Sequence, residues 1–174
     1  MLRNPIRTIA VTTGAAALMT LTAAASSHAE GIGAGGGGKP VTIPSGMPTT
    51  WTFGAGDVCP FKTTIIDIVN ESTGRAFPSG ETLFTGRLKE RITNDETGQT
   101  VVRNISGPGN STFGPNGEWI LTLSGSSIFW ISDGHDPDGL IGNGLYISHG
   151  PVVFVDLVLV QPPASYENLC ETVG

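Results

Sequence analysis

The sequence is short of basic residues, and this shortage excludes one large class of functions. Nine Lys and Arg stand against fifteen Asp and Glu, so the formal net charge at pH 7 is −6. Proteins bind nucleic acid mainly through clustered Lys and Arg side chains that neutralise phosphates. The arginines of this chain are scattered instead. We therefore expect no nucleic-acid binding.

Several catalytic and cofactor signatures are also missing. The Gly-rich residues 31–39 contain neither GxxxxGK[ST] nor a GxGxxG that follows a strand, so they form no phosphate cradle. No GxSxG occurs, and no serine-hydrolase elbow is therefore indicated. The absence of a CxxC pair argues against a zinc site. We expect no cofactor.

A long apolar run occurs only near the N-terminus. Arg3 and Arg7 precede a small and apolar run over residues 9–25, and Ser27-His28-Ala29 offers small residues to a signal peptidase. We interpret residues 1–29 as a Sec-type signal peptide, with a retained membrane anchor as the alternative. Cleavage before Glu30 removes two of the nine basic residues and no acid, so the net charge changes from −6 to −8. The prediction is an acidic, secreted bacterial protein with no transmembrane segment after signal removal.

Cysteine is nearly absent too, and the two residues present lie near the ends of the expected domain. Cys59 and Cys170 form an even count, which in an exported protein is usually a disulfide. The alternatives are two buried free thiols or half of a metal site. A bridged pair would leave no thiolate nucleophile.

Short segments rich in β-branched residues recur between Gly, Asn and Asp turns, and no helical period occurs. The sequence therefore predicts an all-β domain over residues 57–174, preceded by a Gly- and Pro-rich flexible leader and arm over residues 30–56. Trp51 or Phe53 of the arm is expected to dock on the domain. We expect a single antiparallel β-barrel of about eight strands, with a β-sandwich as the alternative. Ser165 is expected to cap a short C-terminal helical turn.

Residues 151–161 form the most apolar run of the mature chain and are predicted to be one inner strand, covered on both faces. Asp156 is the anomaly in this strand, because a buried carboxylate needs a partner or protonation. It is expected either to point into a cavity or to pair with an arginine, namely Arg87, Arg91 or Arg103.

Two further strand pairings are predicted. Residues 81–84 and 87–93 read as one strand interrupted at Gly86, with Leu88, Glu90 and Ile92 on one face and basic residues facing solvent. Residues 119–123 and 128–131 read as a hairpin around Gly125-Ser126. Its cross-strand pairs would form one buried surface, consisting of Trp119, Leu121, Leu123, Ile128 and Trp130.

Several turn and core motifs resemble those of a known group. They are Cys59-Pro60-Phe61, Gly86-Arg87, Gly117 before an aromatic hairpin, Gly150-Pro151 before Val-Val-Phe, and the late Cys170. Over roughly residues 59–170 the chain resembles a group of small secreted proteins predicted in actinobacteria. The resemblance implies a compact, lipocalin-like or allene-oxide-cyclase-like barrel, and it implies no activity.

If the barrel has a cavity, aromatic and polar side chains would line a site for a small apolar molecule. The candidate residues are Asp156, Phe154, Trp119, Trp130, Tyr146 and His149. The alternative is that the aromatic residues are core. Asp156 or His149 could also act as the general base of a barrel isomerase or cyclase.

Asp133, Asp136 and Asp138 lie in the one loop with metal-ligand chemistry. Aligned on Gly139, the loop matches a calcium-binding loop at two acidic positions and fails at its first and twelfth positions. The alternative is a solvated loop in which Asp and Gly supply turn chemistry.

These patterns lead to one main functional hypothesis and two alternatives. The main hypothesis is a secreted, non-catalytic binding or interaction module, with a small apolar molecule or an extracellular protein as partner. The first alternative is the isomerase or cyclase. The second is an envelope-associated structural protein that attaches through the leader and the Trp51 arm.

Overall fold

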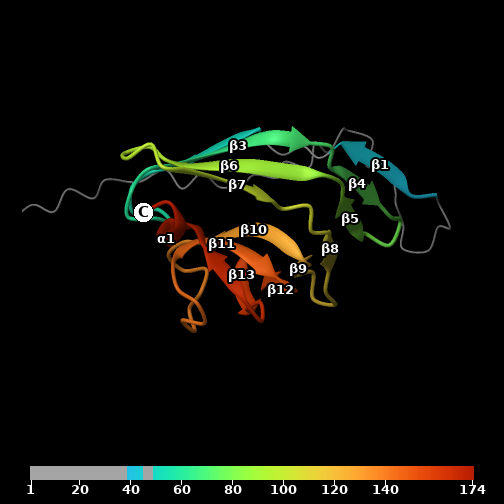
Figure 1. Ribbon diagram of the computed structural model, residues 1–174. Helices are drawn as coiled ribbons and strands as arrows, with labels where there is room; N and C mark the ends of the chain where they lie inside the picture. The colour runs from blue at the N-terminus through green and yellow to red at the C-terminus, as the bar shows by residue number, and fades with distance from the viewer. Residues whose placement is uncertain (1–38, 45–48) are drawn as a thin grey trace, which may run out of the picture. The chain divides into compact units, whose positions relative to one another are not determined.

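The computed structural model describes residues 39–44 and 49–174, all within one compact unit that spans Ala34–Gly174. The predicted signal peptide and most of the Gly-rich leader lie outside the described residues. Nearly all regular structure is antiparallel strand, with one short helix at the C-terminus (Figure 1). The all-β class and the short C-terminal helix are thereby confirmed. No described helix has the length and apolar character needed to cross a membrane.

The strands form three sheets. The 7-stranded sheet has the order β1-β4-β5-β8-β9-β12-β13 and comprises β1 (Val41–Pro44), β4 (Thr73–Ala76), β5 (Thr82–Thr85), β8 (Gly109–Phe113), β9 (Trp119–Leu123), β12 (Val152–Val155) and β13 (Val158–Gln161). The 4-stranded sheet comprises β2 (Thr50–Phe53), β3 (Thr63–Asn70), β6 (Leu88–Asn94) and β7 (Thr100–Asn104). The 3-stranded sheet comprises β10 (Ser126–Ile131), β11 (Gly144–His149) and β14 (Tyr166–Asn168). None of these sheets closes into a barrel over the residues described.

The chain passes from sheet to sheet at sharp bends that contain glycine. The predicted single strand over residues 81–93 is wrong, because β5 and β6 belong to different sheets on either side of Gly86. Gly86 has φ +134, and a Cβ there would lie 2.3 Å from the Glu71 carbonyl oxygen. The Glu71 amide donates to the Arg87 carbonyl at 2.8 Å and fixes the bend. Glycine is thus required here for both conformation and space.

Two apolar clusters cover opposite faces of the β10-β11 pair. Leu145 and Ile147 belong to a cluster with Ile65 and Ile92 of the 4-stranded sheet. The other face of the pair supplies a second cluster with strands of the 7-stranded sheet, made of Phe129, Ile131, Tyr146, Val152, Phe154 and Leu159. Because successive side chains of a strand point to opposite faces, one strand pair serves both clusters. In Figure 1 strands β10 and β11 are drawn between β6 and β7 above and β12 and β13 below.

The C-terminus is tied into the first cluster by covalent and apolar contacts. Helix α1 (Leu169–Thr172) follows β14 directly, and its N-cap is Asn168 instead of the predicted Ser165. The Asn168 side chain accepts from the Cys170 amide at 3.0 Å. Cys170 is bonded to Cys59, with Cα atoms 5.4 Å apart, so the predicted disulfide is confirmed. The segment between the two bonded cysteines makes up most of the domain.

The segment predicted as an arm supplies two strands. β1 pairs with β4 at one edge of the 7-stranded sheet, and β2 pairs with β3 in the 4-stranded sheet. Trp51 and Phe53 of β2 pack on the first cluster, where their ring centroids lie 5.5 and 5.4 Å from that of Trp130. The expected docking of Trp51 or Phe53 is therefore present.

The prediction of one inner strand over residues 151–161 is wrong. The run is a hairpin in which β12 and β13 pair around Asp156 and Leu157, both with positive φ (48° and 70°). β13 lies at the edge of its sheet, and Val160 is 50% exposed. Such two-residue turns usually contain Asn-Gly or Asp-Gly. Because Asp156-Leu157 is not one of these dipeptides, the sequence did not indicate a turn within the apolar run.

The predicted hairpin between residues 119–123 and 128–131 is also wrong. β9 pairs with β8 and β12, whereas β10 pairs with β11. The chain leaves the 7-stranded sheet at Ser124, whose amide donates to the Pro108 carbonyl at 2.8 Å. Gly125, with φ 70°, directly precedes β10, the first strand of the 3-stranded sheet. The predicted turn at Gly125-Ser126 is instead the connection between two sheets. Leu121 and Trp130 therefore lie in different clusters.

Candidate functional site

A row of three ionisable side chains crosses the inner face of the 4-stranded sheet. Asp67 of β3 lies opposite Glu90 of β6, and Glu90 lies opposite Arg103 of β7. Directly opposed residues in antiparallel strands share a face. The adjacent row on this face contains Ile65 and Ile92, which belong to the first apolar cluster. Two carboxyl groups are thus held beside the core.

Glu90 is the most perturbed titratable group among the described residues that carry a resolved shift. It is only 3% exposed, and its Oε2 atom has no hydrogen-bond partner within the described part of the chain. Burial raises the pKa of Glu90 most, and the charge of Asp67 and a hydrogen bond with Asp67 raise it further, to about 8. Glu90 therefore carries a proton at neutral pH, which it can donate to Asp67.

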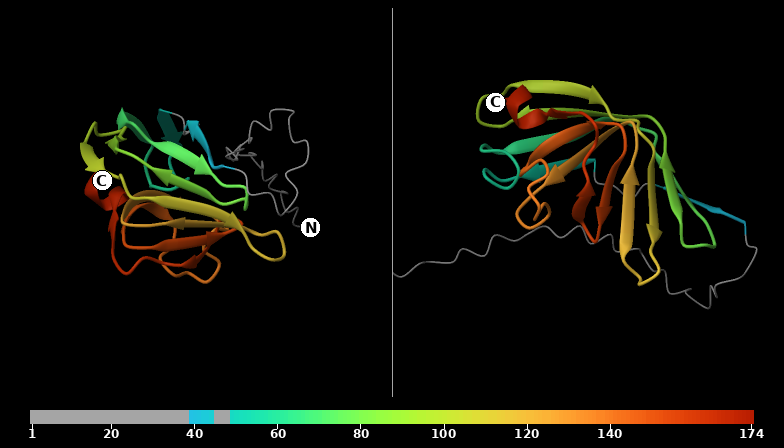
Figure 2. Two further views of the ribbon diagram at one scale, coloured as in Figure 1. Left: turned by 90° about the vertical axis from the view of Figure 1, so that its right-hand side faces the viewer. Right: turned by 90° about the horizontal axis from the view of Figure 1, so that it is seen from below.

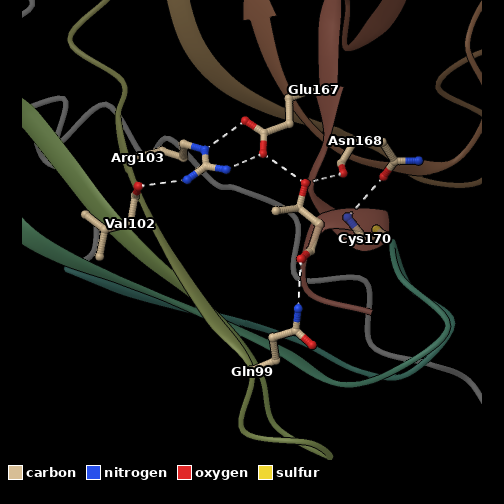
Figure 3. A network of polar contacts seen from close by, with 7 residues as sticks. Gln99, Val102, Arg103, Glu167, Asn168 and Cys170 are labelled. Atoms are coloured by element: carbon tan, nitrogen blue, oxygen red, sulfur yellow. Dashed lines mark hydrogen bonds and ion pairs between the residues drawn. The ribbon is translucent and has the colours of Figure 1, made fainter.

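The Arg103 side chain reaches Glu167 on the neighbouring 3-stranded sheet, and Figure 3 shows this contact. Its Nε and Nη2 atoms donate to the two carboxylate oxygens of Glu167 on β14, at 2.8 and 2.7 Å. The Thr172 hydroxyl donates to Glu167 at 2.9 Å, and Gln99 donates to the Thr172 carbonyl at 3.0 Å. The hydrogen bond from Arg103 is the main cause that lowers the pKa of Glu167. This network links β7 to the C-terminal segment.

The burial of Glu90 limits the atoms to which it can pass its proton. A general acid must reach the atom that it protonates, within about 3 Å or through one water molecule. Glu90 is buried, and its facing groups are Asp67 on one neighbouring strand and Arg103 on the other. Asp67 in turn accepts from the Asn70 side chain at 2.6 Å. The row therefore controls how stability depends on pH.

Sequence analysis placed Glu90 on the apolar face of its strand but did not select it as a site residue. The alternation of Leu88, Glu90 and Ile92 could have indicated this site, because an acid between two core residues must be paired or protonated. Asp67 lies at the matching position of β3, and only the strand register brings the two acids together.

The six predicted ligand residues do not surround one cavity. Phe154 and Tyr146 are buried in the second cluster, whereas Trp130 packs against the first. His149 is exposed at the end of β11, and Trp119 is half-buried near a hairpin turn.

The two expected environments of Asp156 are both wrong. The side chain is exposed in the β12-β13 turn, where it accepts from the Trp119 amide at 2.9 Å. Its backbone amide donates to the Trp119 carbonyl, also at 2.9 Å. The carboxylate therefore stabilises a turn next to β9.

Tyr146 has a structural position as well. Its ring stacks on Phe129 with centroids 5.4 Å apart, and its hydroxyl lies 3.1 Å from the Asn143 carbonyl. Burial is the main cause that raises the pKa of Tyr146. The side chain thus anchors the loop that precedes β11 to the second cluster.

The predicted metal loop is organised around the Asp136 carboxylate. The Asp136 carboxylate accepts from the amides of Leu140, Ile141 and Gly142 at 2.8, 2.9 and 2.7 Å. Burial raises the pKa of Asp136, but these backbone hydrogen bonds outweigh burial and lower it. No group of three or more His, Cys, Asp or Glu side chains could hold a metal ion within the described ranges, so Asp133, Asp136 and Asp138 form no calcium cage there.

One polar recess lies at the bend between β7 and β8. It has a volume of about 340 Å³ and is lined by Asn104, Ser106, Gly107 and Ser126. None of the predicted ligand residues lines this recess. It is open to solvent and carries no charged side chain, so it lacks the apolar lining typical of a small-molecule site.

Comparison of the chain with protein-family models, with curated proteins and with solved structures gives no match.

Proposed function

We propose that this chain is a secreted, non-catalytic interaction module with an extracellular protein as partner. The observation that carries the proposal is the Cys59–Cys170 disulfide, which spans 111 residues of the chain. Disulfides persist in oxidising compartments outside the cytosol. The signal-like residues 1–29 agree with this location. The resemblance to small secreted actinobacterial proteins belongs to the same proposal.

The acidic side chains that could act in catalysis are buried or bound to other groups of the fold, which supports a role without catalysis. Glu90 is buried, Glu167 is paired with Arg103, and Asp136 is bound by backbone amides. Asp156 holds a turn through the Trp119 amide. Each of these groups is therefore buried or bound within the fold.

The carrier of a small apolar molecule is a weaker candidate than the protein-binding module. A carrier needs one apolar cavity lined by several of the candidate residues. Trp130 and Phe154 instead belong to clusters on opposite faces of β10-β11.

Native mass spectrometry of protein recovered from its own culture medium tests this proposal. We expect a chain that begins at Glu30, has the mass of the disulfide form and carries no small molecule. Recovery only from the cytosol as the free dithiol would contradict secretion. A stoichiometric bound small molecule would favour the carrier, and turnover of that molecule would favour the isomerase or cyclase.

We also infer that the sheets form a layered sandwich rather than a closed barrel. The two clusters on opposite faces of β10-β11 support this arrangement. We expect hydrogen exchange to be faster in the edge strands β1 and β7 than in β3, β6 and β9, which have neighbours on both sides. Exchange measured by mass spectrometry on peptides resolves these strands. Equal protection of edge and central strands would instead support a barrel, which has no edges.

A further inference from the structure

Three hairpin turns gather at one end of the 7-stranded sheet. The β4-β5, β8-β9 and β12-β13 hairpins are consecutive in the sheet order, and each runs out and back. Their turns lie at residues 77–81, 114–118 and 156–157. Because all strands are antiparallel, the three turns lie at the same end of the sheet, and Figure 2 shows the hairpins extending in one direction.

Contacts between neighbouring hairpins make these turns one continuous rim. The Phe113 ring lies near Gly80, since a Cβ on Gly80 would be 3.8 Å from it. Phe113 lies opposite Trp119 across the β8-β9 pair. The Asp156 amide donates to the Trp119 carbonyl at 2.9 Å, which joins the third hairpin. We name these three turns, together with Phe113 and Trp119, the hairpin rim.

The rim exposes large apolar side chains. Phe113 is 62% exposed and Leu157 is 46% exposed, and Trp119 is only half-buried. An exposed apolar side chain on its own needs no explanation. Several on one rim, however, are typical of a protein interaction surface.

Leu157 provides an independent observation. Its φ of 70° lies in the left-handed region, where glycine or asparagine is favoured and a γ-branched residue is strained. The exposed side chain regains little of that cost through burial. A strained, exposed leucine in a turn that suits glycine therefore lowers the stability of the folded protein. Residues with such backbone strain cluster at functional sites.

The charges on the rim select the partner. Glu81, Glu118 and Asp156 lie in or beside the three turns, and the turns contain no Lys or Arg. Arg75 of β4 lies beside the first turn, with its guanidinium carbon 5.9 Å from the Phe77 ring centroid. A carboxylate-rich rim around apolar side chains is complementary to a basic surface with apolar side chains, and it repels anionic membranes and acidic proteins.

We propose that the hairpin rim binds a basic, apolar segment of an extracellular protein, with Phe113 and Leu157 as its apolar anchors. This inference rests on the proposed function and assigns the interaction to one surface. Binding buries both side chains against the apolar residues of the partner. Nearby carboxylates face its Lys or Arg side chains, so salt weakens the complex.

The probe is an octapeptide of alternating Lys and Leu, titrated into the nitrogen-15-labelled disulfide-bonded protein and followed by NMR. We expect amide shifts confined to residues 77–81, 113–119 and 155–158. The double substitution Phe113→Ser/Leu157→Gly is expected to weaken binding at least about tenfold. Leu157→Gly alone should raise the Tm, because it relieves the left-handed strain. Val102→Ser is the matched control, since Val102 is also 46% exposed but lies in the 4-stranded sheet.

Each other result has a defined meaning. Equal binding by the double variant, or shifts elsewhere on the protein, would overturn the rim while leaving an interaction module in place. Equal binding of an octapeptide of alternating Glu and Leu would overturn the charge selection. Absence of octapeptide binding, or rim shifts only with phosphatidylcholine vesicles, would also overturn this inference. The location and redox state measured on secreted protein would still test the proposed function separately.

Discussion

Replacing Glu90 with glutamine is expected to stabilise the protein by several kcal/mol at about pH 9 and to leave its stability near pH 4 almost unchanged. The pKa of Glu90 is about 8 in the folded protein against the usual 4.5. Its folded-state pKa is raised, so its contribution to stability is complete below about pH 4.5 and is lost as the pH rises towards 8. The difference corresponds to about 5 kcal/mol at high pH. Urea unfolding at both pH values measures it.

Glu96→Gln is the matched control for this experiment. Glu96 is exposed in the turn directly after β6, and its substitution is expected to change stability by less than about 0.5 kcal/mol at either pH. A carbon-13 titration of the Glu90 carboxyl group gives a direct reading, with a midpoint well above that of an ordinary glutamate. Equal effects of Glu90→Gln at the two pH values would refute the buried, protonated state.

Acidic pH brings an opposite effect from Glu167 and Asp136. The hydrogen bond from Arg103 lowers the pKa of Glu167. For Asp136, burial raises the pKa, but backbone hydrogen bonds outweigh burial and lower it. Their contributions are present above their unfolded-state pKa values and are lost as the pH falls through the folded-state values. Stability therefore passes through a maximum at mildly acidic pH, and Glu90→Gln should flatten only the alkaline side.

Removing the disulfide is expected to destabilise the protein by about 4–5 kcal/mol in the chain-entropy model. The bridge between Cys59 and Cys170 spans 111 residues, so it restricts nearly the whole unfolded domain. Such a loss is more than a quarter of the 5–15 kcal/mol typical of folded domains. The double substitution Cys59→Ala/Cys170→Ala removes the bridge without leaving a thiol or burying a hydroxyl. Urea unfolding at fixed pH measures the loss.

Reduced wild-type protein is the control for the disulfide experiment. It has the same lost constraint but keeps both sulfur atoms, so its stability should match that of the double alanine variant to within about 1 kcal/mol. A loss below about 1 kcal/mol in both would mean that the unfolded chain is already restricted by other contacts. It would also weaken the link between this bridge and an oxidising environment.

The local alternation of residues predicted much of the secondary structure, but not which strands pair. Leu88, Glu90 and Ile92 are buried as the period-2 pattern indicates, and the flanking Arg87, Lys89 and Arg91 are exposed. Strand pairing depends on where the chain crosses from one sheet to another, as it does at the Gly86 bend. In a sequence, a single glycine is compatible with a bulge, a turn or such a bend. Long strands were therefore predicted where two short ones exist.

The candidate site was accessible to sequence analysis only in part. Asp156 attracted attention because it interrupts an apolar run, yet its positive φ makes it a turn residue. Glu90 interrupts a regular alternation and is the acid that is buried. Both are acids among apolar residues, and neighbours distant in sequence decide between the two outcomes. The pairing of Asp67 with Glu90 joins strands 23 positions apart, which no local pattern encodes.

The last residues of the chain have a consequence for the order of folding. Leu169 and Val173 are fully buried, and the Val173 carbonyl accepts from the buried Asn94 side chain at 3.0 Å. The first apolar cluster therefore cannot be completed until residues 169–173 have joined strands that lie far earlier in the sequence. Because contacts between residues far apart in sequence form slowly, closing this cluster is expected to be a late step of folding. Truncation by even a few residues would then act on the core, and not on a dispensable tail.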